Sequence, residues 1–300
     1  MKRLLLALVL TVAATSCINA QERKSEESPT PPSIDSLRHP RAPSVPDFAV
    51  FGGDTVRLDR DDFRERLDRE LLAFTYMHST SILMLKRAPR IFAMVEPIME
   101  AQGLHNDLKY LMVIESNLDP KAVSRSGAVG LWQFMKSAAA TYGLEVSQEV
   151  DERYNIEKET IAACKYLKGS YRRFGDWMTA AASYNAGVGG IGRAVTEQKQ
   201  DSALDLWLTE ETSRYMFRLL AAKMFFEHPD WFGYDIPEEE KYQYKAPREV
   251  VTVSDGIPSL VDFALEHGTT YARLRAANLW LIAPKLTNAS KKTYKIIIPE

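Results

Sequence analysis

The sequence predicts a mainly α-helical protein with a small α+β domain at the C-terminal end. From residue 58 to about residue 229, apolar residues recur at helical spacing. After Tyr234 the pattern changes, because Val250–Val253 and Tyr294–Ile298 are rich in the β-branched residues that favour strands. Two short helical patterns lie between these segments. Residues 248–300 are therefore expected to form a βααβ domain.

Helix-breaking signals divide the helical region. They fall at Gly103, residues 124–130, Gly143, Gly175 and residues 187–192, and residues 131–135 are expected to open a new helix after the second of these breaks. Asp176 is the predicted N-cap of a helix from Trp177 to Ala186, and Gly187 is its predicted stop. The charged run Asp59–Glu70 is expected to be a solvated helix face. Residues 59–103 match no motif and are expected to pack helices around the core.

Composition narrows the class of protein. The 300 residues include 45% apolar residues and carry a formal net charge of −2, which suggests about two domains with a sizeable core and argues against a nucleic-acid partner. Cys17 lies in the N-terminal segment, and the second cysteine, Cys164, lies in a helical pattern where it is expected to be a small buried residue. No intrachain disulfide is expected, so the fold must be held by packing.

The N-terminus resembles an export signal. Lys2 and Arg3 precede an apolar run from Leu4 to Thr15, which is too short to span a membrane. Cleavage after Ala20 would give a signal peptide of residues 1–20. Cleavage after residue 16 would follow a loose lipobox and leave Cys17 for lipidation. Both remain open, and either predicts an exported protein, periplasmic and tethered to the outer membrane if it is lipidated.

Residues 21–47 are expected to be a disordered linker. Gln21–Pro46 is rich in serine, proline and charge and has few apolar residues. A flexible coil of this length reaches on the order of 30 Å, and proline stiffening extends that reach. The linker would precede a helical domain over residues 48–235.

Glu115 is the most informative residue of the helical domain. In the predicted helix Asn106–Ser116, it shares one face with Leu108, Leu111 and Met112. Desolvation beside apolar neighbours raises the pKa of a carboxyl group, as a general acid requires near neutral pH. By base rate such a residue is more often exposed or paired with a cation. Asp119 is followed by Pro120 and is expected to be a turn residue.

Two other chemical readings are not supported by the sequence. Residues 187–192 match the sequence pattern G-x-G-x-x-G, but an alanine-rich helix precedes them, whereas a dinucleotide-binding site requires a strand there. These glycines are expected to form a helix stop and a tight loop. The five histidines are scattered and form no His-x-x-x-His pair. No metal and no cofactor are therefore expected.

Three separated motifs resemble those of one enzyme family. They are Glu115–Ser116, Gly130–Gln133 and Ser183–Asn185, in the order and spacing of the lytic transglycosylases of glycoside hydrolase family 23, within the goose-type lysozyme superfamily. The block Asp151–Arg153, the block Phe174–Trp177 and the later Glu211–Tyr215 resemble the membrane-bound transglycosylase D branch. Ser183 and Lys136 depart from the usual alanine and proline. The resemblance is strong over residues 107–215 and implies a lysozyme-like catalytic domain.

The resemblance implies a lyase that acts on peptidoglycan. Most glycosidases use two carboxylates, but no second one stands out here, which favours reuse of Glu115 as acid and then as base. In the family the bond between N-acetylmuramic acid and N-acetylglucosamine is cleaved as the C6 hydroxyl of the muramic acid attacks, which closes a 1,6-anhydro ring on that same sugar without consuming water. A hydrolase resembling goose-type lysozyme remains an alternative, as does a non-catalytic wall-binding lipoprotein.

The same resemblance implies the substrate-binding residues. They are Ser124, Gln133, Met135, Tyr184, Asn185 and Glu211. Ser124 and Gln133 would supply hydrogen bonds to glycan, Tyr184 would lie beside Glu115, and Asn185 would hold the local turn. By base rate Tyr184 and Met135 are core residues, and Ser124 and Gln133 cap helix ends. Tyr215 is read as a packing residue.

Residues 248–300 resemble a LysM domain, a peptidoglycan-binding module. The resemblance rests on Val251–Gly256, the helical patterns 258–267 and 271–278, and the final strand. Such a module would raise the local concentration of glycan near the active site. Ser254 and Pro258 depart from the usual opening of the module, so a degenerate domain that only packs on the core is the alternative.

Overall fold

A computed structural model describes residues 42–300. The predicted signal peptide, Cys17 and the linker up to residue 41 lie outside the described residues. Within the described part, no helix combines the length and the apolar character that crossing a membrane requires.

A short β-hairpin precedes the first helix, and the sequence reading missed it. Strands β1 (Phe48–Phe51) and β2 (Asp54–Arg57) pair antiparallel, and Gly52 and Gly53 turn the chain with positive φ angles. Phe51 and Val56 are buried in the main core. The Gly52 amide donates to Asp107 Oδ2 at 3.0 Å, which fixes the hairpin to the segment before the Glu115 helix.

The helical region contains the predicted succession of helices with short 3₁₀ turns between them. The α-helices are α1 (Asp61–Tyr76), α2 (His78–Ala101), α3 (Tyr110–Ser116), α4 (Lys136–Thr141), α5 (Ile156–Phe174), α6 (Trp177–Ala186), α7 (Val188–Gln198) and α8 (Glu210–Glu227). The 3₁₀ helices are η2 (Asn106–Lys109), η3 (Glu152–Tyr154), η4 (Ala203–Asp205), η5 (Pro229–Phe232) and η6 (Glu238–Glu240). The breaks at Gly103, Gly143 and Gly175 are confirmed, because each glycine has positive φ at a helix end or turn.

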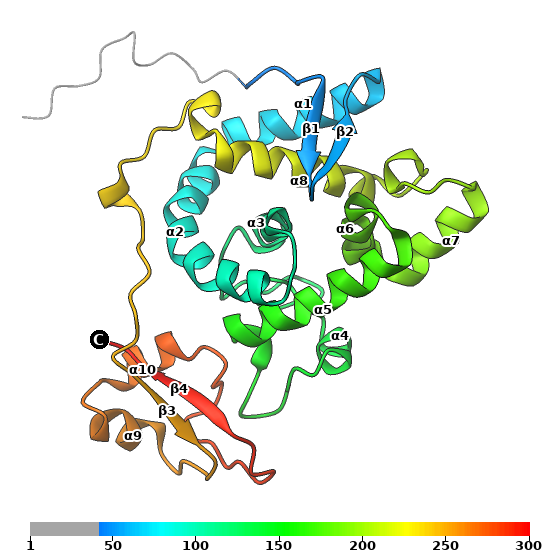
Figure 1. Ribbon diagram of the computed structural model, residues 1–300. Helices are drawn as coiled ribbons and strands as arrows, with labels where there is room; N and C mark the ends of the chain where they lie inside the picture. Colours follow the sequence, from blue (N-terminus) through cyan, green and yellow to red (C-terminus); the bar gives the residue numbers. More distant parts are fainter. Residues whose placement is uncertain (1–41) are drawn as a thin grey trace, which may run out of the picture. The chain divides into compact units, whose positions relative to one another are not determined.

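Helix α3 is the centre of the main core. Figure 1 shows it lying among α2, α5, α6 and α8. Leu108, Leu111 and Met112 are fully buried, so the predicted apolar face is confirmed, although Leu108 belongs to η2. A seven-residue helix is marginal alone. Tertiary packing therefore holds the segment that carries Glu115.

The expectation of a solvated face over Asp59–Glu70 is wrong at Glu70. This carboxylate is 0% exposed and accepts hydrogen bonds from the Nε atoms of Arg214, at 2.7 Å, and Arg218, at 3.0 Å. Helix α1 packs along α8, which brings the two arginines to it. A buried charge is tolerated only when it is paired, and a one-dimensional charge pattern does not reveal partners 144 and 148 residues away.

Helix α6 is capped as predicted. Asp176 accepts from the amides of Met178 at 3.2 Å and Thr179 at 2.8 Å, and Gly187 ends the helix with a φ of 79°. The predicted tight loop after it is wrong, because Val188–Gln198 forms α7 with three glycines inside it. One of these glycines, Gly192, lies against the guanidinium end of the Arg173 side chain.

Replacement of the cap is the first testable consequence. We expect Asp176→Ala to lower the free energy of unfolding by about 1–2 kcal/mol, because two amides at the start of α6 lose their acceptor. Urea unfolding measures this change. Asp201→Ala, at an exposed position between α7 and η4, is the control and should leave the urea midpoint unchanged. Equal midpoints for the two variants would contradict the assigned cap.

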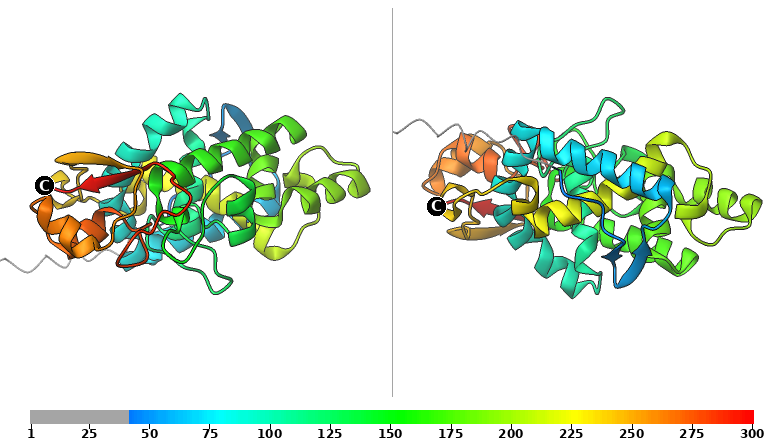
Figure 2. Two further views of the ribbon diagram at one scale, coloured as in Figure 1. Left: turned by 90° about the horizontal axis from the view of Figure 1, so that it is seen from below. Right: turned by 90° about the horizontal axis from the view of Figure 1, so that it is seen from above.

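The C-terminal residues form the predicted βααβ arrangement. Strand β3 (Glu249–Val253) pairs antiparallel with β4 (Tyr294–Ile298), and α9 (Leu260–Glu266) and α10 (Tyr271–Ala277) lie between them in sequence. Figure 2 shows the two helices against one side of the strand pair. Tyr294, Ile296 and Ile298 alternate into a second apolar core with residues of both helices.

The segment before η3 takes part in this second core. Val150 is 1% exposed and packs within it, and it pairs with Leu281 in an antiparallel bridge. The Asp151 amide donates to the Trp280 carbonyl at 2.8 Å. Glu149 accepts two hydrogen bonds of 2.6 Å from the amide and hydroxyl of Thr287. The C-terminal domain therefore packs on residues that directly precede Arg153.

Candidate active site

Glu115 stands one residue before the end of α3. The helix ends because Asn117 and Leu118 adopt left-handed backbone angles, with φ of 52° and 55°. Ser116 is buried and its hydroxyl donates to the Met112 carbonyl within the helix. Glu115 itself is half-buried.

The environment of Glu115 suits a general acid. Burial raises the pKa of its carboxyl group from 4.5 to about 7, the Tyr215 hydroxyl lowers it, and the negative charge of Glu211 raises it. At neutral pH a substantial fraction of the group therefore holds its proton. A carboxyl group with a pKa near the working pH can donate a proton and take one back.

Tyr215 directly contacts the acid, and the sequence reading missed this role. Its hydroxyl donates to Glu115 Oε1 at 2.7 Å, so the description of Tyr215 as only a packing residue is wrong. The residue is 8% exposed and comes from α8, 100 positions away in sequence. Exposed Glu211, one turn earlier on α8, acts on Glu115 only through its charge.

The loop with Ser124 lies before α4 and folds on itself. Ser124 accepts from the Ala128 amide through Oγ at 3.0 Å, and its own amide donates to the Ala128 carbonyl at 2.9 Å. Gly130 is required in this loop: its φ is 86°, and a Cβ would lie 1.9 Å from the Arg153 carbonyl oxygen. The loop is therefore closed against the segment around Arg153.

Gln133 is part of the loop rather than of a helix. The expectation that residues 131–135 open a helix is wrong, because α4 begins at Lys136 and Gln133 has a φ of 51°. Its side-chain nitrogen donates to the carbonyls of Ala122, at 3.2 Å, and Gly130, at 2.8 Å. Met135 follows with 42% of its surface exposed, so it is not a core residue.

Tyr184 lies between the loop and the acid. Its hydroxyl donates to the Trp132 carbonyl at 2.7 Å, and its ring meets Tyr166 edge-on at 4.9 Å. Burial raises the pKa of Tyr184 well above 10, and the charges of Glu115 and Glu159 add to this. The hydroxyl that orients Glu115 is thus that of Tyr215. Asn185 accepts from the Thr212 hydroxyl at 2.8 Å and joins α6 to α8.

A second buried carboxyl group, Glu159, lies behind the loop. It is 0% exposed on α5 and accepts from the amides of Leu131, at 3.3 Å, and Trp132, at 3.1 Å. Full enclosure keeps it from touching a glycan. Nothing in the sequence distinguishes Glu159, because a glutamate in the first turn of a helix is ordinary.

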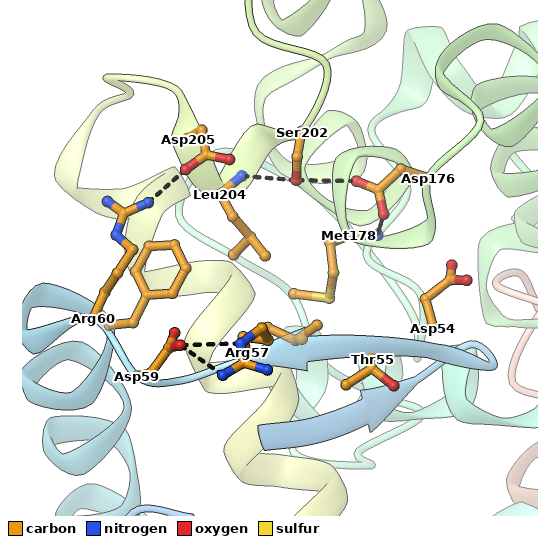
Figure 3. A pocket seen from close by; sticks show the side chains of 12 residues that line it. Asp54, Thr55, Arg57, Asp59, Arg60, Asp176, Met178, Ser202, Leu204 and Asp205 are labelled. Atoms are coloured by element: carbon orange, nitrogen blue, oxygen red, sulfur yellow. Dashed lines mark hydrogen bonds and ion pairs between the residues drawn. The ribbon is translucent and has the colours of Figure 1, made fainter. Parts of the chain in front are cut away.

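A hollow of about 270 Å³ lies away from these residues. Figure 3 shows it between the β-hairpin, the start of α6 and the turn around Ser202. Among its charged groups, Arg57 pairs with Asp59 and Arg60 with Asp205. None of the site residues predicted from the sequence lines it.

Comparison with known proteins assigns the two parts of the chain. The profile of the Transglycosylase SLT domain matches residues 99–206, and that of the Soluble lytic transglycosylase C-terminal LysM-like domain matches residues 249–300. Membrane-bound lytic murein transglycosylase D of Escherichia coli K12 is 26% identical over 223 residues, covering 70% of this chain and 48% of that protein. The chain thus spans about half the length of this relative.

Two further similarities are more limited in extent. Peptidoglycan transglycosylase gp16 of Escherichia phage T7 is 37% identical over 126 residues, covering 40% of this chain and 9% of that protein. A solved structure of the lytic transglycosylase Slt from Pseudomonas aeruginosa is 19% identical, covers 51% of this chain and 26% of that chain, and superimposes with a TM-score of 0.37. The chain carries a transglycosylase SLT domain followed by a LysM-like domain, and is homologous to membrane-bound lytic murein transglycosylase D.

Proposed function

We propose that this protein is a peptidoglycan lytic transglycosylase. It cleaves the β-1,4 bond between N-acetylmuramic acid and N-acetylglucosamine and leaves a 1,6-anhydro end on the muramic acid. The single observation that carries this proposal is a half-buried Glu115 with a pKa of about 7 and a tyrosine hydroxyl on its carboxylate, within a domain matched as a transglycosylase. Glu115 is the catalytic residue.

One carboxyl group performs both proton transfers in this mechanism. Glu115 first protonates the bridging oxygen as the bond to the leaving sugar breaks, and then, as a carboxylate, accepts the proton of the C6 hydroxyl as that oxygen closes on C1. Tyr215 stabilises the carboxylate between the two steps through its hydrogen bond. Glu159 takes no part in proton transfer, because both its oxygens face backbone amides inside the protein.

The remaining site residues bind glycan in this proposal. The Ser124 hydroxyl and the free oxygen of the Gln133 amide supply hydrogen bonds, and exposed Met135 supplies an apolar contact. Tyr184 and Asn185 position the cleft walls from α6, and exposed Glu211 contacts the glycan beside Glu115. The LysM-like domain adds a second glycan contact. No cofactor or metal is assigned a role in either step.

Product analysis tests this function. Purified peptidoglycan is digested and the released muropeptides are weighed. Anhydro ends, lighter by one water than reducing ends, are the expected products. Hydrated reducing ends would instead indicate a goose-type lysozyme-like hydrolase, and binding without release would indicate a wall-binding lipoprotein.

We also propose that Cys17 is lipidated and anchors the exported protein to the outer membrane, so that the protein works in the periplasm. With the full chain expressed in a Gram-negative host, we expect wild type in the outer-membrane fraction and Cys17→Ser in the soluble periplasmic fraction, because the variant lacks the acceptor thiol. Cys164→Ser, which changes only the buried thiol, is the control and should stay in the membrane fraction. Wild type in the soluble fraction would contradict the anchor.

A further inference from the structure

The loop of residues 124–135, which carries Ser124 and Gln133, is held by charged groups that the proton-transfer steps do not use. On one side, Arg153 donates to the carbonyls of Gly127, at 3.0 Å, and Phe134, at 3.2 Å, while Asp151 holds its guanidinium. On the other side, the Glu159 carboxyl group accepts from the amides of Leu131 and Trp132. Carbonyl oxygens of the loop thus accept hydrogen bonds from a cation, Arg153, and two of its amides donate hydrogen bonds to an acid, Glu159.

Trp132 is held through its amide, its side chain and its carbonyl. Its indole is fully buried and donates from Nε1 to the Thr160 hydroxyl at 3.0 Å, so consecutive residues of α5 hold its backbone and its side chain. Its carbonyl accepts the hydroxyl of Tyr184 at 2.7 Å. The next residue, Gln133, has a φ of 51°. This left-handed conformation is uncommon for a residue other than glycine and needs support from its surroundings.

We propose that Glu159 is a positioning residue for the cleft, whose two carboxyl oxygens fix the backbone of Leu131 and Trp132 and so keep Gln133 and Tyr184 placed for the glycan. The contribution is geometric, because Glu159 is enclosed and does not meet substrate. The inference rests on the proposed function of the cleft.

Burial of a carboxyl group has a cost that an apolar residue would avoid. Burial raises the pKa of Glu159 well above its usual value, and the two amide hydrogen bonds oppose that rise. In either protonation state, the carboxyl group offers oxygen to both amides, whereas the isosteric glutamine would present an NH₂ group to one of them. The role of Glu159 therefore depends on its two hydrogen-bond acceptors and their place in the fold, and not on the shape of the side chain alone.

Two substitutions separate positioning from packing. Glu159→Gln keeps the volume but places a donor against a donor, and Glu159→Asp loses a methylene but keeps two acceptors. A positioning role predicts that kcat/KM on soluble glycan strands falls about tenfold or more in Glu159→Gln and less in Glu159→Asp. A packing role predicts the reverse order. Glu157→Gln, an exposed residue two positions earlier on α5, is the matched control and should match wild type.

Binding without turnover completes the test. In a Glu115→Gln background, glycan strands should bind about tenfold more weakly when Glu159→Gln is added and equally well when Glu157→Gln is added. Should Glu159→Gln not fold, Glu159→Asp decides: weaker glycan binding together with faster amide exchange at Leu131 and Trp132 supports the proposal, and unchanged binding overturns it. A wild-type protein that cleaves no peptidoglycan would contradict the proposed function. An active wild type together with an equally active Glu159→Gln would contradict only the positioning role of Glu159.

Discussion

Glu115→Gln is expected to lower the rate of peptidoglycan cleavage by a factor of about 10³ or more, because one group carries out both proton transfers and a positioned acid or base contributes about 10²–10⁴ to each. The amide has nearly the shape of the carboxyl group but cannot donate the required proton. Binding of glycan strands should persist, so the loss should fall on kcat rather than on KM. Single-turnover release of muropeptides measures it.

The matched control for this substitution is Glu65→Gln, on the exposed face of α1. It makes the same chemical change away from the cleft and should leave cleavage at the wild-type level. Urea unfolding of both variants confirms that the fold is retained. A Glu115→Gln protein that keeps more than about a tenth of the wild-type rate would exclude Glu115 as the principal acid.

Tyr215→Phe is expected to have the second largest effect, a fall in kcat of about 10- to 100-fold. The substitution removes the hydroxyl that donates to Glu115 Oε1 at 2.7 Å and leaves the ring in place. A hydrogen bond to a charged group contributes about 1.5–3 kcal/mol. The carboxylate formed after the first proton transfer loses this stabilisation, so the step that creates it becomes slower.

The same substitution should also shift the pH dependence, and the sign of the shift follows from the contact. Wild-type activity requires protonated Glu115 at the start and should decline as the pH rises through its pKa of about 7. The Tyr215 hydroxyl favours the ionised form and lowers that pKa. Its loss therefore raises the pKa, and the alkaline limb of kcat/KM should move upward by about one pH unit.

Tyr76→Phe is the control for Tyr215→Phe, since Tyr76 is half exposed at the end of α1. It should alter neither kcat nor the alkaline limb. A profile of Tyr215→Phe that moves to lower pH, or that does not move, would contradict the assigned direction of the hydrogen bond. An unchanged kcat would show that Tyr215 only packs against the acid.

The fold was predictable where local signals and burial agree. The helices around Glu115, the cap at Asp176 and the two C-terminal strands all follow from apolar spacing, capping residues or β-branched runs. The hairpin Phe48–Arg57 was missed because four-residue strands carry too little periodicity. Helix α7 was missed because glycine lowers helix propensity, and the helix contains three glycines.

The site was predictable in its acid but not in its supporting contacts. Glu115 can be singled out in the sequence because it lies on the apolar face of a short helix, and the raised pKa of its carboxyl group agrees with that expectation. Tyr215, Glu159 and the arginines that hold Glu70 act across 27 to 148 positions of sequence. Such pairings depend on how helices pack, and no local pattern in one sequence specifies them.

Cleavage in water enriched in ¹⁸O tests the central claim, that Glu115 alone serves as acid and base while the substrate supplies the attacking oxygen. Peptidoglycan is digested in the labelled water, and the new muramic acid ends are analysed by mass spectrometry. The predicted result is anhydro ends without ¹⁸O, because the C6 hydroxyl closes the ring and no water enters. Reducing ends that carry ¹⁸O would contradict the claim and identify a hydrolase.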